Sequence, residues 1–190
     1  MAHAYLSGEN HGLIIGNFIG DYVRGNDYLK YPVEIQKGIL LHREIDRFTD
    51  SHELFRKSKR LFYNGFEKHS GILVDIYFDH LLAKYFKELT NYELINYTKS
   101  IYEIYTDHVE NNSIPNKHFL NYVISNDIYN NYSVLNQIEV VLYQMSQRIK
   151  HDVALHKSVE NFKENEDLLT NHFKSFFGEI KNHIIKFRQF

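Results

Sequence analysis

Apolar residues recur every three or four positions along most of this chain, which is the spacing of helices with one buried face. Only 2 prolines and 9 glycines interrupt the 190 residues, so long helices are permitted. No turn of the Asn-Gly type joins two alternating runs, as a β-hairpin requires. The pattern predicts about seven or eight helices in an all-α fold. Their expected ranges are residues 12–24, 32–48, 52–66, 71–86, 91–109, 115–126, 133–149 and from about 156 onward.

Capping residues support several of these limits. Pro32 suits the first position of the second helix, Asp50 and Ser51 can cap the third, and Asn91 can cap the fifth. The run NNSIPN, residues 111–116, is the clearest loop in the chain.

The whole chain, residues 1–190, is expected to form a single domain. It contains no internal repeat and no linker, and it is long enough to bury a substantial core. The last helix carries an apolar stripe, which predicts packing against the same domain rather than a membrane anchor. The stripe consists of Phe173, Phe176, Phe177, Ile180, Ile184 and Phe187.

Composition excludes several classes of function. The chain has no cysteine, so disulfides, zinc fingers and thiol nucleophiles are absent. A net charge of −2 argues against general nucleic-acid binding, which needs a broad basic surface. The apolar run at residues 13–23 is too short to span a bilayer, and the first residues lack the basic region of a signal peptide. We therefore expect a cytoplasmic protein that binds neither nucleic acid nor membrane.

The most informative stretch is the run ILVDIYFDHLLAKYF, residues 72–86. Within this apolar helix lie Asp75, Asp79 and His80, with no cation before Lys84. Carboxylates that a helix carries into a core are costly unless they are paired or bind a metal ion. These three side chains therefore need a partner.

A second polar face can supply that partner. His42, Asp46 and Asp50 recur at i, i+4 and i+8, so they fan across roughly 80° of one helix. Two such faces opposite each other would form a cage of nitrogen and oxygen ligands, which Mn²⁺, Fe²⁺, Zn²⁺ and Mg²⁺ accept. A core network of salt bridges with Arg43 or Arg47 is the alternative, and the spacing alone does not decide between them.

The segment FRKSKR, residues 55–60, carries four cations: Arg56, Lys57, Lys59 and Arg60. Such a cluster is either an ordinary solvated helix face or a docking patch for an acidic partner.

Four blocks together resemble the acyl carrier protein phosphodiesterase family, a distant branch of the HD-type metal phosphohydrolases. The blocks are AHAYLSG (2–8), GNFIGDYVRG (16–25), GILLHREIDRFTD (38–50) and VDIYFDHLLAKYF (74–86). The resemblance implies an all-helical HD-like fold with a catalytic divalent ion, usually Mn²⁺. It also implies hydrolysis of the phosphodiester that joins 4′-phosphopantetheine to a serine of holo acyl carrier protein, an acidic partner used in fatty acid biosynthesis.

The resemblance also implies which residues form the site. The matching positions are His3, Asp21, His42, Asp46, Asp50, Asp75, Asp79 and His80. The His-Asp doublet of HD enzymes is reversed here, as Asp79-His80.

We expect His42, Asp79, His80 and Asp21 to supply most metal ligands, with Asp46 and Asp75 either ligating or orienting the imidazoles. His3 joins the metal set through its matching block. Arg43 or Arg24 would bind the phosphoryl oxygens, because guanidinium matches phosphate.

Two other functions remain open on the sequence. One is an HD-type nucleotidase or other small phosphodiesterase that uses the same ligands. The other is a non-catalytic helical binding module, in which the buried acids only pair with Arg43, Arg47 and Arg24.

Overall fold

The computed structural model describes residues 1–111, 117–149 and 153–188, and every regular element in these ranges is a helix. The all-α prediction is confirmed, and nine helices in the described ranges have seven or more residues. The α-helices are α1 (Ala2–Leu6), α2 (His11–Ile19), α3 (Val33–Ser51), α4 (Glu53–Arg60), α5 (Tyr63–Phe66), α6 (Ser70–Lys84), α7 (Phe86–Thr90), α8 (Leu94–Asn111), α9 (Lys117–Ser125), α10 (Ile128–Asn131), α11 (Leu135–Ser146), α12 (Ser158–Glu164) and α13 (Glu166–Phe187). The 3₁₀ segments are η1 (Gly20–Tyr22), η2 (Asp27–Lys30), η3 (Glu67–His69) and η4 (Leu155–Lys157).

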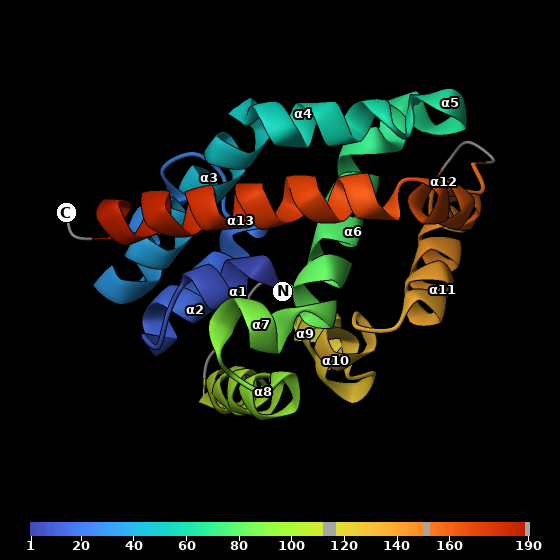
Figure 1. Cartoon of the computed structure of the whole chain (residues 1–190). Coiled ribbons are helices and arrows are strands. Elements are labelled where there is room, and N and C mark those ends of the chain that lie inside the picture. The colour runs from blue at the N-terminus through green and yellow to red at the C-terminus, as the bar shows by residue number, and fades with distance from the viewer. Residues whose placement is uncertain (112–116, 150–152, 189–190) are drawn as a thin grey trace.

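The long helix α13 runs across the front of the molecule in Figure 1, between α4 above and α1 with α2 below. Helix α3 lies behind its C-terminal half, and α6 passes behind its N-terminal half. Helix α8 forms the lower edge, and α11 and α12 close one end.

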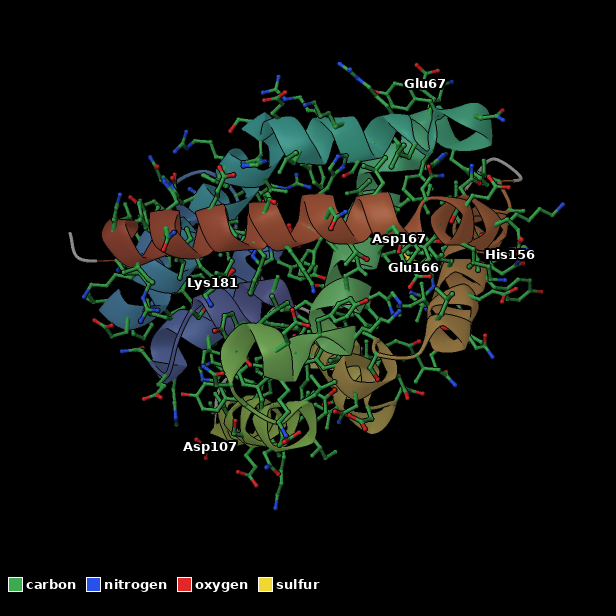
Figure 2. All side chains as sticks on the ribbon, in the orientation of Figure 1. Glu67, Asp107, His156, Glu166, Asp167 and Lys181 are labelled. Atoms are coloured by element: carbon green, nitrogen blue, oxygen red, sulfur yellow. The ribbon has the colours of Figure 1, made fainter. Side chains whose placement is uncertain are left out.

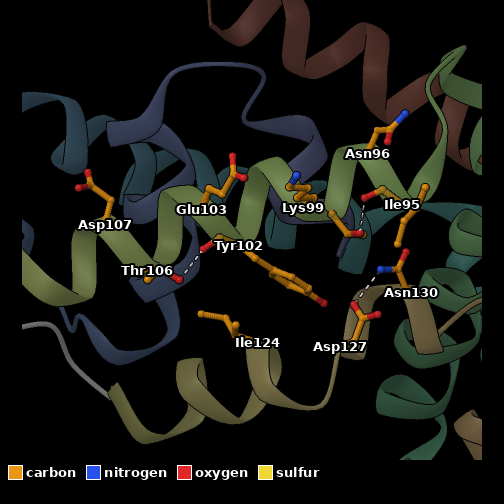
Figure 3. Close-up of a pocket in the computed structure, with 11 residues that line it drawn as sticks. Ile95, Asn96, Lys99, Tyr102, Glu103, Thr106, Asp107, Ile124, Asp127 and Asn130 are labelled. Carbon is orange, nitrogen blue, oxygen red and sulfur yellow. Dashed lines mark hydrogen bonds between the residues drawn. The ribbon is translucent and has the colours of Figure 1, made fainter.

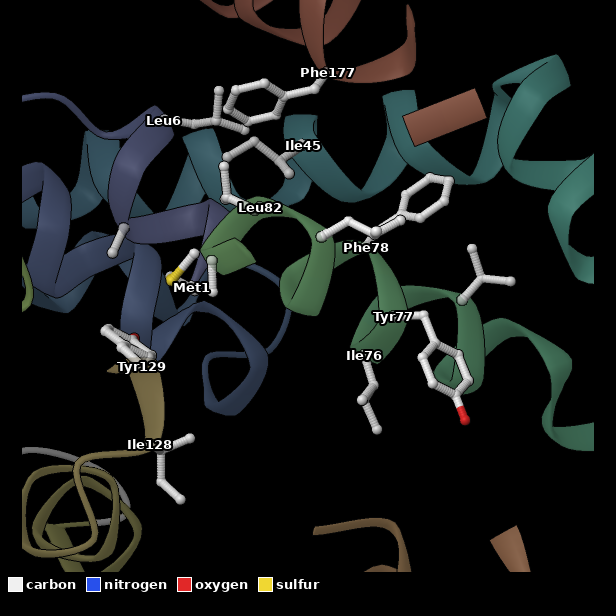
Figure 4. Close-up of a cluster of buried hydrophobic side chains, with 14 of the residues drawn as sticks. Met1, Leu6, Ile45, Ile76, Tyr77, Phe78, Leu82, Ile128, Tyr129 and Phe177 are labelled. Atoms are coloured by element: carbon white, nitrogen blue, oxygen red, sulfur yellow. The ribbon is translucent and has the colours of Figure 1, made fainter. Parts of the chain in front are cut away.

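Helix α6 forms the centre of the core, as its apolar sequence predicts. Leu73, Val74, Tyr77, Leu81 and Leu82 are fully buried. Apart from the side that carries its two aspartates, the helix is largely apolar and packs against its neighbours. Figure 4 shows α6 side chains beside apolar residues from helices α1, α3, α10 and α13.

Helices α2 and α3 touch through glycine. A Cβ atom on Gly16 would lie 2.2 Å from the carbonyl oxygen of Ile35 and 2.8 Å from the Cα atom of Gly38. A Cβ atom on Gly20 would lie 2.3 Å from the Cγ atom of His42. Only glycine allows these approaches, so the backbone of α2 lies directly against that of α3, and the start of η1 lies against His42.

The predicted stripe on α13 packs inward, except at its last position. Phe173, Phe176, Phe177, Ile180 and Ile184 are buried, whereas Phe187 is 39% exposed near the end of the helix. No helix among the described residues is both long and apolar enough to cross a membrane.

Charged side chains in both halves of α13 stabilise the helix or pair with a neighbouring helix. Glu166 and Asp167 lie at its N-terminal end in Figure 2, where carboxylates favour the helix dipole. Further along, His183 pairs with Glu44 of α3, and Arg47 also binds Glu44 at 2.6 Å. Hydrogen bonds from Arg47 and His183 lower the pKa of Glu44 although its burial acts in the opposite direction.

Several predicted helix limits were wrong. Helix α3 continues through Ser51, so Asp50 lies inside it, and His52 caps α4 by accepting a hydrogen bond from the Leu54 N–H at 3.2 Å. Asn91 ends α7 in the left-handed conformation instead of starting the next helix. The short helix α1 was not predicted, and the predicted loop at residues 111–116 falls almost wholly outside the described residues.

Replacing Gly16 with alanine should destabilise the protein by about 1–3 kcal/mol, because the new methyl group would push α2 away from α3. Urea denaturation measures the change. Gly178→Ala is the matched control: this glycine lies in α13 with nothing within 4 Å of the added atom, so its substitution should leave stability equal or raised. An equal response of the two variants would contradict the close contact.

Candidate functional site

Three side chains from two helices meet beside the contact of α2 and α3. His3 comes from α1, and His42 and Asp46 come from successive turns of α3. The Nε2 atom of His3 lies 3.3 Å from Oδ1 of Asp46, and the Nε2 atom of His42 lies 3.1 Å from Oδ2. Both imidazoles therefore direct the same nitrogen toward one carboxylate.

Asn17 and Asp21 complete this cluster from α2 and η1. Asn17 Oδ1 lies 2.7 Å from Nδ1 of His3 and 3.2 Å from Nδ1 of His42. Asp21 Oδ1 lies 3.1 Å from Nε2 of His42. Asn17 is buried, whereas the Asp21 side chain is largely exposed at the rim of the cluster.

The cluster fits a divalent cation. One ligand atom each from His3, His42 and Asp46 lies within 4.8 Å of the other two. Two imidazole nitrogens and a carboxylate oxygen are donors that Mn²⁺, Fe²⁺ and Zn²⁺ accept. The chemistry and spacing of these donors therefore suit a metal with further open positions.

The electrostatics of the cluster favour positive charge. Burial acts to lower the pKa of His42, but hydrogen bonds and charges of Asp21 and Asp46 outweigh it and raise this pKa to about 9. The hydrogen bond to His42 lowers the pKa of Asp21. Burial acts to raise the pKa of Asp46, yet its hydrogen bonds to His3 and His42 bring it well below the ordinary value.

The cluster forms one end of a cavity of ≈ 530 Å³. Five aspartates line this cavity: Asp21, Asp46, Asp50, Asp75 and Asp79. The structure thus brings together carboxylates from η1, α3 and α6, as the sequence predicts. The same cavity is lined by aromatic and apolar side chains, among them Phe18, Phe119, Val123, Tyr129 and Tyr132.

The two aspartates of α6 differ in their surroundings. Asp79 accepts hydrogen bonds from the amino group of Met1 at 2.6 Å and from the Ala2 N–H at 2.9 Å. Asp75 opens onto the cavity, but the protein around it and the charges of Asp79 and Asp46 raise the pKa of this carboxyl to about 7. Near neutral pH Asp75 can therefore donate or accept a proton.

Three predicted site residues lie elsewhere. His80 is buried on another face of α6, where its Nδ1 atom donates to the Tyr132 carbonyl at 2.7 Å and its ring packs edge-on against Phe162. Arg43 donates to the carbonyls of Val23 and Gly25 at 3.0 and 2.8 Å. Arg24 is exposed just after η1. None of His80, Arg43 and Arg24 lines the cavity.

The positions of the arginines bear on the salt-bridge alternative. Arg47 pairs with Glu44 instead of a cavity aspartate. Among the described residues, no ion pair joins an arginine to Asp21, Asp46, Asp75 or Asp79. A core network based on arginine is therefore not what satisfies these carboxylates.

The predicted cationic cluster lies on α4, which directly follows the acidic end of α3. Arg56, Lys57 and Arg60 are exposed, and Lys59 is half-buried. Lys57 pairs with Glu53 at 2.7 Å. The charge of Lys59 acts to lower the pKa of Asp75, and α4 packs against α6, although no residue of α4 lines the cavity.

A larger hollow of ≈ 610 Å³ lies between α8 and the α9–α10 region (Figure 3). Its charged side chains are of both signs, and Asn130 donates to Asp127 at 2.8 Å within it. None of the residues predicted for the site lines this hollow. The smaller cavity with the imidazoles is therefore the candidate site.

Fold and cluster together define the class of this protein as an all-helical domain with an acid–imidazole site of the kind that enzymes use. Its sequence matches the acyl carrier protein phosphodiesterase family over residues 1–180. The chain therefore belongs to the acyl carrier protein phosphodiesterase family, a family of enzymes.

Individual relatives carry the same name. An acyl carrier protein phosphodiesterase of Yersinia pestis is 35% identical over 89 residues, and this match spans 47% of the chain and 46% of that relative, about half of its length. Relatives so named from Enterobacter sp. (strain 638) and Escherichia coli O45:K1 are 28% and 26% identical, and each match covers 95% of this chain and 94% of the relative. No solved structure matches the chain.

His42→Asn should weaken Mn²⁺ binding at least tenfold, because it removes one of the three donor atoms that the cluster brings together. His80→Asn should leave the affinity unchanged, since this equally buried histidine faces away from the cavity. Titration followed by electron paramagnetic resonance measures the free ion. If the His80 variant lost Mn²⁺ binding and the His42 variant kept it, His80 rather than His42 would belong to the metal site.

Proposed function

We propose that this protein hydrolyses the phosphodiester between 4′-phosphopantetheine and a serine of holo acyl carrier protein, with a divalent ion held by His3, His42 and Asp46. Membership of the family supports the substrate. The observation that carries the proposal is the convergence of two imidazoles and a carboxylate within 4.8 Å, at the acidic end of a cavity with aromatic walls.

The charge of the cavity is the reason to include a metal. Five aspartates line it, and the described lining residues include no lysine or arginine. A phosphodiester is an anion, and a bound divalent cation would offset the aspartates that oppose its entry. When bound, a divalent ion neutralises charge on phosphoryl oxygens and lowers the pKa of water, which supplies the nucleophile at neutral pH.

The side chains of the cavity have separate roles in this proposal. Asp46 and the two imidazoles would hold the cation, and Asp21, whose Oδ1 atom lies 3.1 Å from the same Nε2 atom of His42, would face it as a further carboxylate. Asp75, which lines the same cavity, would be the acid that gives a proton to the departing serine oxygen. The expected roles of Arg43 and Arg24 in binding phosphate are dropped, because neither lines the cavity.

The rest of the cavity suits the remainder of the substrate. Phe18, Phe119 and Val123 present apolar surface next to the acidic end. The pantetheine arm is a slender chain with methyl groups and amides, and it would lie along this wall. Helix α4 would meet the acidic carrier protein through Arg56, Lys57, Lys59 and Arg60.

Mass spectrometry of holo acyl carrier protein tests the activity directly. Incubation with the protein and Mn²⁺ should remove the mass of phosphopantetheine, and chelation of the metal should stop the reaction. Asp46→Asn should abolish turnover. Asp75→Asn should lower turnover about 10²–10⁴-fold while Mn²⁺ still binds, because a proton donor is lost and the ligands are not. An unchanged carrier mass with the metal-loaded wild-type protein would reject the proposed function.

Charge reversal on α4 tests the docking surface. The variant Arg56→Glu/Lys57→Glu/Arg60→Glu should raise KM for holo acyl carrier protein and weaken its dependence on salt. Turnover of a small pantetheine phosphodiester should not change. Lys99→Glu/Lys157→Glu/Lys163→Glu, an equal charge reversal on α8, η4 and α12, is the control and should leave KM near the wild-type value. Equal effects of the two triple variants would argue against docking on α4.

A further inference from the structure

The amide of Asn17 joins two imidazoles that lie on different helices. Asn17 is 1% exposed, and its Oδ1 atom lies 2.7 Å from Nδ1 of His3 and 3.2 Å from Nδ1 of His42. An amide oxygen has two lone pairs and can accept from two donors at once. Both rings therefore carry a proton on Nδ1 when they bind this oxygen.

The orientation of the amide is fixed from its other side. Asn17 Nδ2 donates to the carbonyl oxygen of His3 at 3.0 Å and to Oγ of Ser7 at 2.9 Å. Rotating the amide by half a turn would place its oxygen against the His3 carbonyl oxygen and would break both bonds. Buried polar groups that lose their partners are costly, so the observed orientation is the one that satisfies every atom.

The consequence lies on the opposite edge of each ring. A neutral imidazole with its proton on Nδ1 has a free lone pair on Nε2. The Nε2 atoms of His3 and His42 lie 3.3 and 3.1 Å from the two oxygens of Asp46. In the absence of a metal these nitrogens donate to the Asp46 oxygens, and a single cation that takes the place of those protons would meet both lone pairs.

We propose that Asn17 is a positioning residue whose amide oxygen holds His3 and His42 with Nδ1 protonated, so that both rings offer Nε2 to one divalent cation. This inference rests on the proposed metal-dependent function. In the other tautomer each ring would direct an N–H toward Asp46 and could not ligate there. Residues that orient metal-binding histidines commonly change metal affinity 10–100-fold when they are removed, which sets the scale of the expected effect at about that size.

Mn²⁺ titration of the full chain, followed by electron paramagnetic resonance, tests the role of the oxygen. Asn17→Leu removes the acceptor and should weaken binding about 10–100-fold. Asn17→Asp keeps an acceptor for both rings and should bind more tightly than Asn17→Leu. Thr98→Val, which replaces a fully buried polar side chain on α8, controls for burial and should bind Mn²⁺ like the wild-type protein. Wild-type affinity in a folded Asn17→Leu variant would overturn the proposal.

A spectroscopic measurement covers the case in which Asn17→Leu does not fold. Long-range ¹H–¹⁵N correlation spectra of the wild-type protein with Zn²⁺ identify the ligating nitrogen of each histidine, and we expect Nε2 in both. Ligation through Nδ1 of either ring would overturn this assignment while leaving the proposed function intact. A wild-type protein that binds neither Mn²⁺ nor Zn²⁺ would instead reject the metal site itself.

Discussion

The contact between the backbones of α2 and α3 sets the geometry of the site. Because Gly16 and Gly38 carry no side chain, the two helices approach closely enough for Asn17 to reach His42. The absence of a side chain on Gly20 leaves room for the His42 ring to pack against its backbone. The side chains of the cluster are thus held by the packing of rigid helices, a more exact support than a loop would give.

The cavity concentrates five aspartates, which are offset by His42 and the amino group of Met1 but by no lysine or arginine among the described lining residues. Two of its aspartates, Asp75 and Asp79, lie one turn apart on α6, a helix with most of its side chains buried. Two like charges so close together make the folded state less stable, and the same repulsion helps to raise the pKa of Asp75. A cation bound in the cavity would reduce the repulsion between these carboxylates. The same ion would therefore both complete the site and stabilise the folded protein.

The sequence predicted the helices and the polar faces well, because both depend on local spacing. The apolar run at residues 72–86 became α6, and Asp75 with Asp79 share the expected face. His80 was expected among the ligands but points about 100° away from Asp79 on the helix, toward the Tyr132 carbonyl and the Phe162 ring, and does not line the cavity. The role of Asn17 depends on partners 14 and 25 residues away, which only the packing of the helices brings together.

Arg43 shows how a residue can affect a site without entering it. Its guanidinium fastens the carbonyls of Val23 and Gly25, and it lies over the ring of Tyr28. This fixes the chain just after Asp21, the aspartate at the rim of the cluster. Loss of activity in an Arg43 variant could therefore be mistaken for the loss of a phosphate-binding group. The actual defect would be a less ordered segment after Asp21, away from the substrate.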